Sequence, residues 1–222
     1  MKKTLLLLSL LCSITVLSFA QEATKIGRNA YLKVNPVTLI NELDIYLEQE
    51  ISDKMSLEVG VSGIYTDYPD YILAKKIDIR QKKPDISTAQ FVDGRGLGFR
   101  AGMRWYLFSR EPVPASRAAG TYFEPIVFFK KVFYPNEKNT FNNATYTDSG
   151  DKSVIGLQLL IGRQFKKDKF ILDPYMGLGI RSKIYQYNTF HFDNSDVTLN
   201  KGKMVSVLPS LQIGIKMGLK LW

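Results

Sequence analysis

The chain has 222 residues, which is enough for one domain of ordinary size and too few for two large ones. Its formal net charge is +9. It has a single cysteine, Cys12, which excludes a small secreted scaffold held by disulfides. Beyond the first twenty residues no apolar run reaches the roughly 18 residues of a membrane-spanning helix, which excludes a helical membrane protein.

The first segment, "MKKTLLLLSLLCSITVLSFA", has the three parts of a secretory signal peptide. Two lysines form the basic start, residues 5–17 form the apolar core, and a small-x-small cleavage site ends at Ala20. We therefore predict a signal peptide over residues 1–20 and one domain over residues 21–222. Without the two lysines the net charge is +7. Export from the cytoplasm also means that no nucleic-acid partner is expected.

Downstream of this segment, apolar residues recur at every second position, which is the period of a β-strand. Several of these segments reach the roughly 9–11 residues that cross a bilayer at a tilt. The last segment is the clearest, because apolar residues from Leu211 to Leu221 alternate with polar residues and glycine. The eight predicted strands cover residues 30–34, 43–51, 55–62, 97–105, 121–134, 155–164, 172–181 and 211–221.

The connections between these strands alternate in length with two exceptions: the first is short where a loop is expected, and residues 109–120 are long where a turn is expected. Tight polar turns are predicted at residues 52–54 and 166–169, and long polar loops at residues 66–95, 135–152 and 188–203. Short turns at one rim and long loops at the other are typical of outer-membrane barrels with an even number of strands. The predicted fold class is therefore all-β, an eight-stranded antiparallel up-and-down transmembrane β-barrel.

Alternation alone does not say which face points outward, since a soluble lipocalin-like barrel would place its apolar side inside. Glycine favours the opposite arrangement. On a solvated outer face glycine weakens a strand, whereas in a narrow eight-stranded barrel it makes room for long neighbours. The glycines that share the polar face are Gly60, Gly98, Gly102, Gly156, Gly162, Gly177, Gly179, Gly214 and Gly218. We therefore predict that the polar face lines the lumen.

The charges of the polar face nearly balance, as a confined interior requires, because an unpaired buried charge is costly. The seven acids and eight bases expected in the lumen are Lys33, Glu42, Asp44, Glu48, Glu50, Glu58, Arg100, Arg104, Glu124, Lys130, Asp173, Arg181, Lys183, Lys216 and Lys220. A lumen packed with paired charges is expected to be plugged, so general porin activity is disfavoured.

Aromatic residues gather near the ends of the predicted strands. Two girdles at the bilayer interfaces would place them there, although aromatic residues are also good strand formers. The residues concerned are Tyr65, Trp105, Phe108, Tyr122, Phe123, Tyr134, Phe165, Phe170, Tyr185 and Tyr187.

Two short motifs carry a resemblance to a known family. "LDPYMGLGI" resembles the Pro-Tyr-x-Gly-x-Gly strand start of small bacterial outer-membrane β-barrel proteins of the OmpA/OmpX type, and "FEPIVFF" is similar to it. The terminal aromatic strand resembles the family's assembly signal, although Trp222 is out of phase with the apolar residues before it. The resemblance implies the cell outer membrane as location. It implies outer-membrane lipid and the assembly machinery as partners, and it covers nearly the whole mature chain.

Catalytic and metal-binding signals are weak. His191 is the only histidine, and the His-x-Ser pair of lipid-modifying barrels is missing, because Phe192 and Asp193 follow it. Asp193, Asn194, Ser195 and Asp196 lack the spacing and glycine of a calcium loop. We therefore expect no enzyme activity, no cofactor and no metal site.

The predicted loop 66–95 contains a markedly basic stretch, residues 72–83. Its cations, which form a candidate site for an anionic partner such as lipid phosphate, are Lys75, Lys76, Arg80, Lys82 and Lys83. The alternatives are an ordinary solvated loop or an extra hairpin that would raise the strand number to ten.

The expected function follows from the fold. It is an integral outer-membrane barrel with a plugged polar lumen and a structural or binding role through its extracellular loops. The alternatives are a soluble exported barrel that binds an apolar ligand and a membrane-embedded lipid-modifying enzyme.

Overall fold

A computed structural model describes residues 28–76, 84, 86–108, 119–141, 144–193 and 196–222. The predicted signal peptide lies outside these residues. The elements, in chain order, are β1 (Ala30–Val34), the 3₁₀ helix η1 (Pro36–Ile40), β2 (Glu42–Ser52), β3 (Met55–Ile64), α2 (Tyr68–Lys76), α3 (Thr88–Val92), β4 (Arg95–Phe108), β5 (Gly120–Phe133), β6 (Glu137–Phe141), β7 (Ala144–Asp148), β8 (Gly150–Lys167), β9 (Phe170–Asp193) and β10 (Asp196–Lys220).

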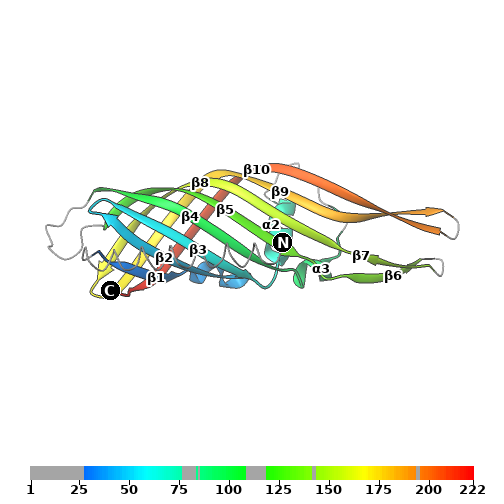
Figure 1. Cartoon of the computed structure of the whole chain (residues 1–222), viewed down its shortest axis with the longest axis horizontal. Helices are drawn as coiled ribbons and strands as arrows, with labels where there is room; N and C mark the ends of the chain where they lie inside the picture. The colour runs from blue at the N-terminus through cyan, green and yellow to red at the C-terminus, as the bar shows by residue number, and fades with distance from the viewer. Residues whose placement is uncertain (1–27, 77–83, 85, 109–118, 142–143, 194–195) are drawn as a thin grey trace, which may run out of the picture.

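Eight of the strands form one closed antiparallel ring in the order β1-β10-β9-β8-β5-β4-β3-β2 (Figure 1). The ring closes where β1 pairs with the end of β10, with Tyr31 opposite Lys220 and Val34 opposite Met217. The prediction of eight antiparallel strands in sequence order is confirmed. The other two strands, β6 and β7, form a separate hairpin.

The two ends of the ring differ. The turn end carries the C-terminus and the tight turns β2–β3 and β8–β9, the second of which places Asp168 at a φ of 56°. The hairpin end carries the β6–β7 hairpin and the long extension of β9 and β10 (Figure 1).

Two predicted loops are therefore strands. The β6–β7 hairpin occupies much of the predicted loop 135–152, and β9 and β10 pair through most of residues 188–203, out to Asp193 opposite Asp196. Both segments are mostly polar, and the few apolar residues of the second, such as Phe190 and Phe192, alternate over too short a stretch to predict a strand. Backbone pairing nevertheless continues through both segments.

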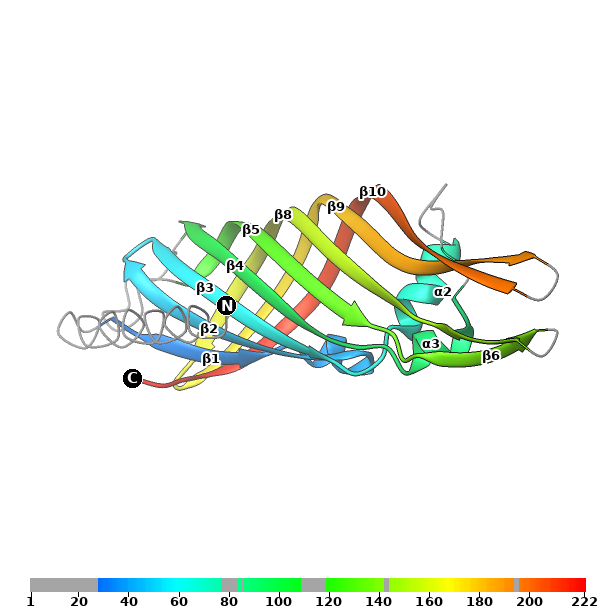
Figure 2. The same ribbon diagram turned by 45° about the vertical axis from the view of Figure 1, so that its right-hand side comes forward.

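The described part of the segment between β3 and β4 lies at the hairpin end (Figure 2). Helices α2 and α3 lie in this segment, and α3 starts with a capping box in which Ser87 and Gln90 bond each other's backbone amides. The extra hairpin proposed for residues 72–83 is wrong where the structure describes it, since residues 72–76 belong to α2.

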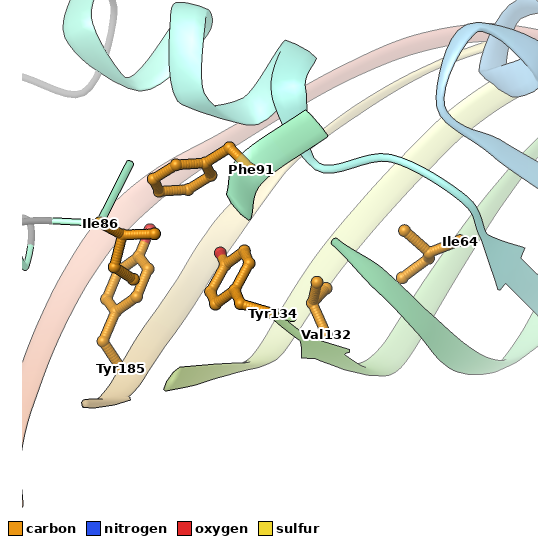
Figure 3. Close-up of a cluster of buried hydrophobic side chains, with 6 residues drawn as sticks. All are labelled: Ile64, Ile86, Phe91, Val132, Tyr134 and Tyr185. Carbon is orange, nitrogen blue, oxygen red and sulfur yellow. The ribbon is translucent and has the colours of Figure 1, made fainter. Parts of the chain in front are cut away.

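An apolar cluster holds this segment in the ring mouth (Figure 3). It consists of Ile64, Ile86, Phe91, Val132, Tyr134 and Tyr185. The Phe91 ring packs edge-on against Tyr134, with centroids 5.0 Å apart. The ring mouth is thus filled by its own chain.

The outer surface of the ring is apolar. The large hydrophobic side chains exposed on it include Leu32, Val34, Leu43, Ile45, Leu57, Val61, Leu97, Phe99, Val127, Phe129, Ile155, Leu157, Leu159, Ile161, Met176, Leu178, Ile180, Val207, Leu211, Ile213, Ile215, Met217 and Leu219. We call this surface the apolar belt. Inside, glycine leaves room for rings: a Cβ at Gly214 would lie 2.6 Å from the Tyr175 hydroxyl oxygen, and one at Gly60 would lie 2.6 Å from Cδ1 of Tyr46.

Candidate functional site in the ring interior

A buried arginine lies at the centre of the interior charges. The guanidinium of Arg104, on β4, has no exposed surface and donates to four carboxylates from four other strands. Its Nη1 lies 2.9 Å from Asp173 Oδ2 and 3.3 Å from Glu48 Oε2. Its Nη2 lies 2.9 Å from Oε2 of both Glu58 and Glu124. One planar fork of donors therefore ties the strands together.

Two lysines from the closing strands complete this central network. Lys33 on β1 forms ion pairs with Glu48, with Asp173 at 3.0 Å and with Glu58 at 3.3 Å. Lys216 on β10 pairs with Glu58. The described residues of the central network are thus three cations and four carboxylates, all buried, from seven strands.

Tyrosines donate to two of the carboxylates of the central network, whereas Oε1 of Glu124 has no hydrogen-bond partner. The Tyr122 hydroxyl donates to Asp173 Oδ1 at 2.6 Å, and the Tyr106 hydroxyl donates to Glu48 Oε1 at 2.7 Å. The Arg104 guanidinium also stacks over the Tyr122 ring, 3.8 Å from its centroid. Such a dense, fully desolvated network closes the interior at this level.

A smaller cluster lies toward the turn end. Glu50 accepts from the Tyr31 hydroxyl, from Lys166 Nζ and from Asn29 Nδ2, at 2.8, 2.8 and 2.9 Å. It links β1, β2 and β8 beneath the central network.

A third cluster lies at the hairpin end. It anchors the segment of α2 and α3 in the ring mouth, which we call the plug. Lys152 Nζ lies 2.6 Å from both carboxylate oxygens of Asp67 and 2.8 Å from Asp70 Oδ2. Lys183 lies 3.0 Å from Asp70 Oδ1, and the Tyr134 hydroxyl donates to Asp67 at 2.6 Å. Burial alone would raise the pKa of Asp70 in α2, but Lys152 and Lys183 hold it well below its usual value. These ion pairs fix α2 to β8 and β9.

Between the central network and the plug the interior is less completely paired. Lys130 pairs with Glu42, and Asp44 accepts from the hydroxyls of Tyr46 and Ser62. Arg100, only 8% exposed, donates to Gln212 Oε1 at 3.3 Å, and among the described residues no carboxylate lies within salt-bridge distance of it.

The other predicted residues divide by position. Arg181 is partly buried and lies in phase with the inward-pointing residues of β9. Lys220 is partly exposed near the end of β10. Arg80, Lys82 and Lys83 of the candidate anionic-partner loop lie outside the described residues. The loop's other two cations, Lys75 and Lys76, fall in α2, where the structure does not describe their side chains.

His191 is exposed on the projecting β9–β10 hairpin, opposite Thr198. The structure does not describe the side chains of Asp193 and Ser195. Within the described ranges, no group of three or more histidine, cysteine or acidic side chains is placed to hold a metal ion.

Alternation places Tyr46 and Tyr175 on the polar face, but sequence reasoning missed other interior tyrosines. Tyr122, Tyr134 and Tyr185, which were expected in the girdles, are buried inside the ring. A signal was present, because Tyr46, Tyr106, Tyr122 and Tyr175 each lie two residues from a predicted lumen charge and therefore share its face. The plug acids Asp67 and Asp70 had no comparable signal in a polar loop.

No family model, curated protein or solved structure matches the chain. Among the described residues there is no helix with the length and apolar character needed to cross a membrane.

Proposed function

We propose that the chain is an integral outer-membrane β-barrel protein with a plugged lumen, and that it serves a structural or binding role through the projecting hairpins. The observation that carries the proposal is the combination of the apolar belt outside with the buried charges inside. Monomeric soluble proteins rarely expose a contiguous apolar patch larger than a few hundred Å². Over the lengths where the ring strands pair on both sides, their backbone polar groups are satisfied internally, as contact with lipid requires.

The same observation argues against a soluble barrel that carries an apolar ligand. Such a protein keeps its apolar face inside and a solvated face outside. Here the interior holds charged side chains such as Arg104 and Asp173, and Leu178 and Ile213 point outward. The interior would have to reject an apolar ligand, because binding it would break ion pairs at low dielectric.

The plug and the hairpins indicate a binding role rather than conduction. The central network closes the interior at one level, and α2 and α3 fill the mouth at another. The β6–β7 hairpin and the β9–β10 extension project beyond the ring and contact each other, with the Tyr146 and Phe190 ring centroids 4.4 Å apart. In this proposal the projecting hairpins face the cell exterior and present the binding surface.

The test is electrophoresis of the isolated outer-membrane fraction in SDS with and without boiling. A closed strand ladder resists SDS until it is heated, so the unboiled protein should migrate differently from the boiled one. Release of the protein by osmotic shock, with the same mobility in both samples, would contradict the proposal.

A further inference from the structure

The ring has a seam on one side of β10. This strand pairs with β9 from Asp196 to Leu219, but with β1 only from Met217 to Lys220. In the part of the chain that the structure describes, no strand pairs with this edge of β10 between residues 205 and 216. The short helix η1 follows β1 at this point, and its Val37, Leu39 and Ile40 are exposed. We call the unpaired edge of β10 between residues 205 and 216 the seam.

A proline agrees with the seam. The amide of Leu221 donates to Ala30 on the β1 side, whereas the amide of Lys220 donates to Lys169 on the β9 side. Because amides alternate along a strand whose pairing with β9 has no register shift, odd-numbered residues from 205 to 219 direct their amides toward β1 or the seam. The amide position of Pro209 therefore faces the seam. Proline has no N–H to donate, and it is tolerated there because this edge of β10 is unpaired.

The interior beside the seam contains an incompletely satisfied cation. Nη1 of Arg100 is buried and has no hydrogen-bond partner, and the nearby acids Asp44 and Glu42 are bonded to other groups. Gln158, also more than nine-tenths buried, has an unpartnered Oε1. Both residues are tied to β10 beside the seam, Arg100 through Gln212 and Gln158 through Ser210. A buried guanidinium with a vacant donor favours an anion.

The interior side chains around Arg100 are also more exposed to solvent than those of the central network. Gln212 and Ser62 are partly exposed although they point inward, and the Lys130 side chain is 23% exposed. The Lys33, Arg104 and Lys216 side chains have no exposed surface. A chain of hydrogen bonds joins this level to η1, because Gln212 donates to the Tyr175 hydroxyl at 2.9 Å and Asn35, the N-cap of η1, donates to it at 3.1 Å.

We propose that the interior at Arg100 binds the anionic head of a single-chain amphiphile, a phosphate monoester or a carboxylate, that enters from the membrane through the seam. The head takes the vacant Nη1 donor, and the hydrocarbon tail passes between β10 and η1 toward the exposed Val37, Leu39 and Ile40. This inference rests on the proposed membrane placement of the ring. The alternative source of the same chemistry is free phosphate from solvent.

The test is titration calorimetry of the full chain, folded in dodecyl maltoside, with octyl phosphate and separately with inorganic phosphate. Octyl phosphate should bind wild type, and Arg100→Gln should weaken binding at least tenfold because it removes the charge and the Nη1 donor. Arg163→Gln is the matched control, since Arg163 is exposed on the outside of the ring and only attracts anions nonspecifically. Equal binding by wild type and Arg100→Gln would overturn the site.

Inorganic phosphate distinguishes the two sources. It should bind at least tenfold more weakly than octyl phosphate, and equal affinity would overturn entry through the seam. Arg100→Lys, which keeps a charge but loses the planar fork, should weaken binding about threefold and serves as the second variant if Arg100→Gln does not fold. The electrophoretic test is independent of these titrations, so a heat-shifted outer-membrane protein that ignores octyl phosphate overturns this inference alone.

Discussion

Arg104 and Asp173 come from strands three places apart in the ring, yet their Nη1 and Oδ2 atoms lie 2.9 Å apart inside it. The same guanidinium reaches Glu48, Glu58 and Glu124, so its charge serves carboxylates on both sides of β4. The backbone ladder joins only neighbouring strands, whereas this side chain joins distant ones. The central network therefore braces the ring across its interior as well as closing it.

Arg104→Met should destabilise the protein by about 3–5 kcal/mol, the usual cost of leaving buried charges without their partner. Four carboxylates would then remain with only Lys33 and Lys216. Urea unfolding of the protein refolded in phosphatidylcholine vesicles measures the change. Arg163→Met, at an exposed position, should alter stability by less than about 0.5 kcal/mol. Equal effects of the two variants would show that the central network does not stabilise the ring.

Gly179→Ala should cost about 1–3 kcal/mol through overpacking. A Cβ at Gly179 would contact the carbonyl oxygen of Leu157 and lie 2.7 Å from the Cα of Gln158, so backbone rather than a flexible side chain would have to move. Gly63→Ala is the matched control, because nothing lies within 4 Å of its Cβ position. The same urea titration should leave Gly63→Ala within about 1 kcal/mol of wild type, and a similar loss in both variants would contradict the steric explanation.

The ring was predictable from sequence because its two faces meet different surroundings. Alternation in a segment such as residues 172–181 places each apolar side chain outside and each charge inside, and β9 has this arrangement. The ends of β9 and β10 were predicted as loop because residues 188–203 are mostly polar. Their apolar residues do alternate, and the register pairs Phe190 with Leu199 and Phe192 with Val197. This alternation covers only two apolar residues in each strand, which is too short to predict a strand.

The plug shows the second limit. Asp67 and Asp70 have the sequence context of an ordinary polar loop, and their partners Lys152 and Lys183 follow 82 to 113 residues later. No local pattern joins groups so far apart. The tyrosines are different, since Tyr175 lies in phase with Asp173, and phase alone was enough to place it inside.

Lowering the pH should release α2 from the ring mouth. Because Lys152 and Lys183 hold the pKa of Asp70 below its usual value of about 4, the released helix binds a proton more readily than the docked one. The stabilisation is therefore fully present above about pH 4 and is lost as the pH falls from there toward the lowered pKa. Hydrogen exchange of residues 68–76, corrected for intrinsic rates, should show protection that falls from about pH 4 to about pH 2.

Two variants separate this effect from general acid unfolding. Asp70→Asn should already show reduced protection at pH 6 and little further fall, because the titrating group is gone. Asp168→Asn, in the exposed β8–β9 turn, should keep the wild-type profile, since asparagine also tolerates a positive φ. A wild-type profile in Asp70→Asn would show that other groups control docking.

An arginine on the apolar belt should reveal what the belt contacts. Leu178 is 60% exposed on the ring portion of β9, and Leu199 is 52% exposed on the projecting part of β10. If the ring lies in lipid and the hairpin in water, Leu178→Arg should cost about 2–4 kcal/mol in phosphatidylcholine vesicles. Leu199→Arg should cost less than about 0.5 kcal/mol, because a charge replaces an apolar group in contact with solvent. Equal and small effects at both positions would mean that water covers the belt, and the membrane placement would then be wrong.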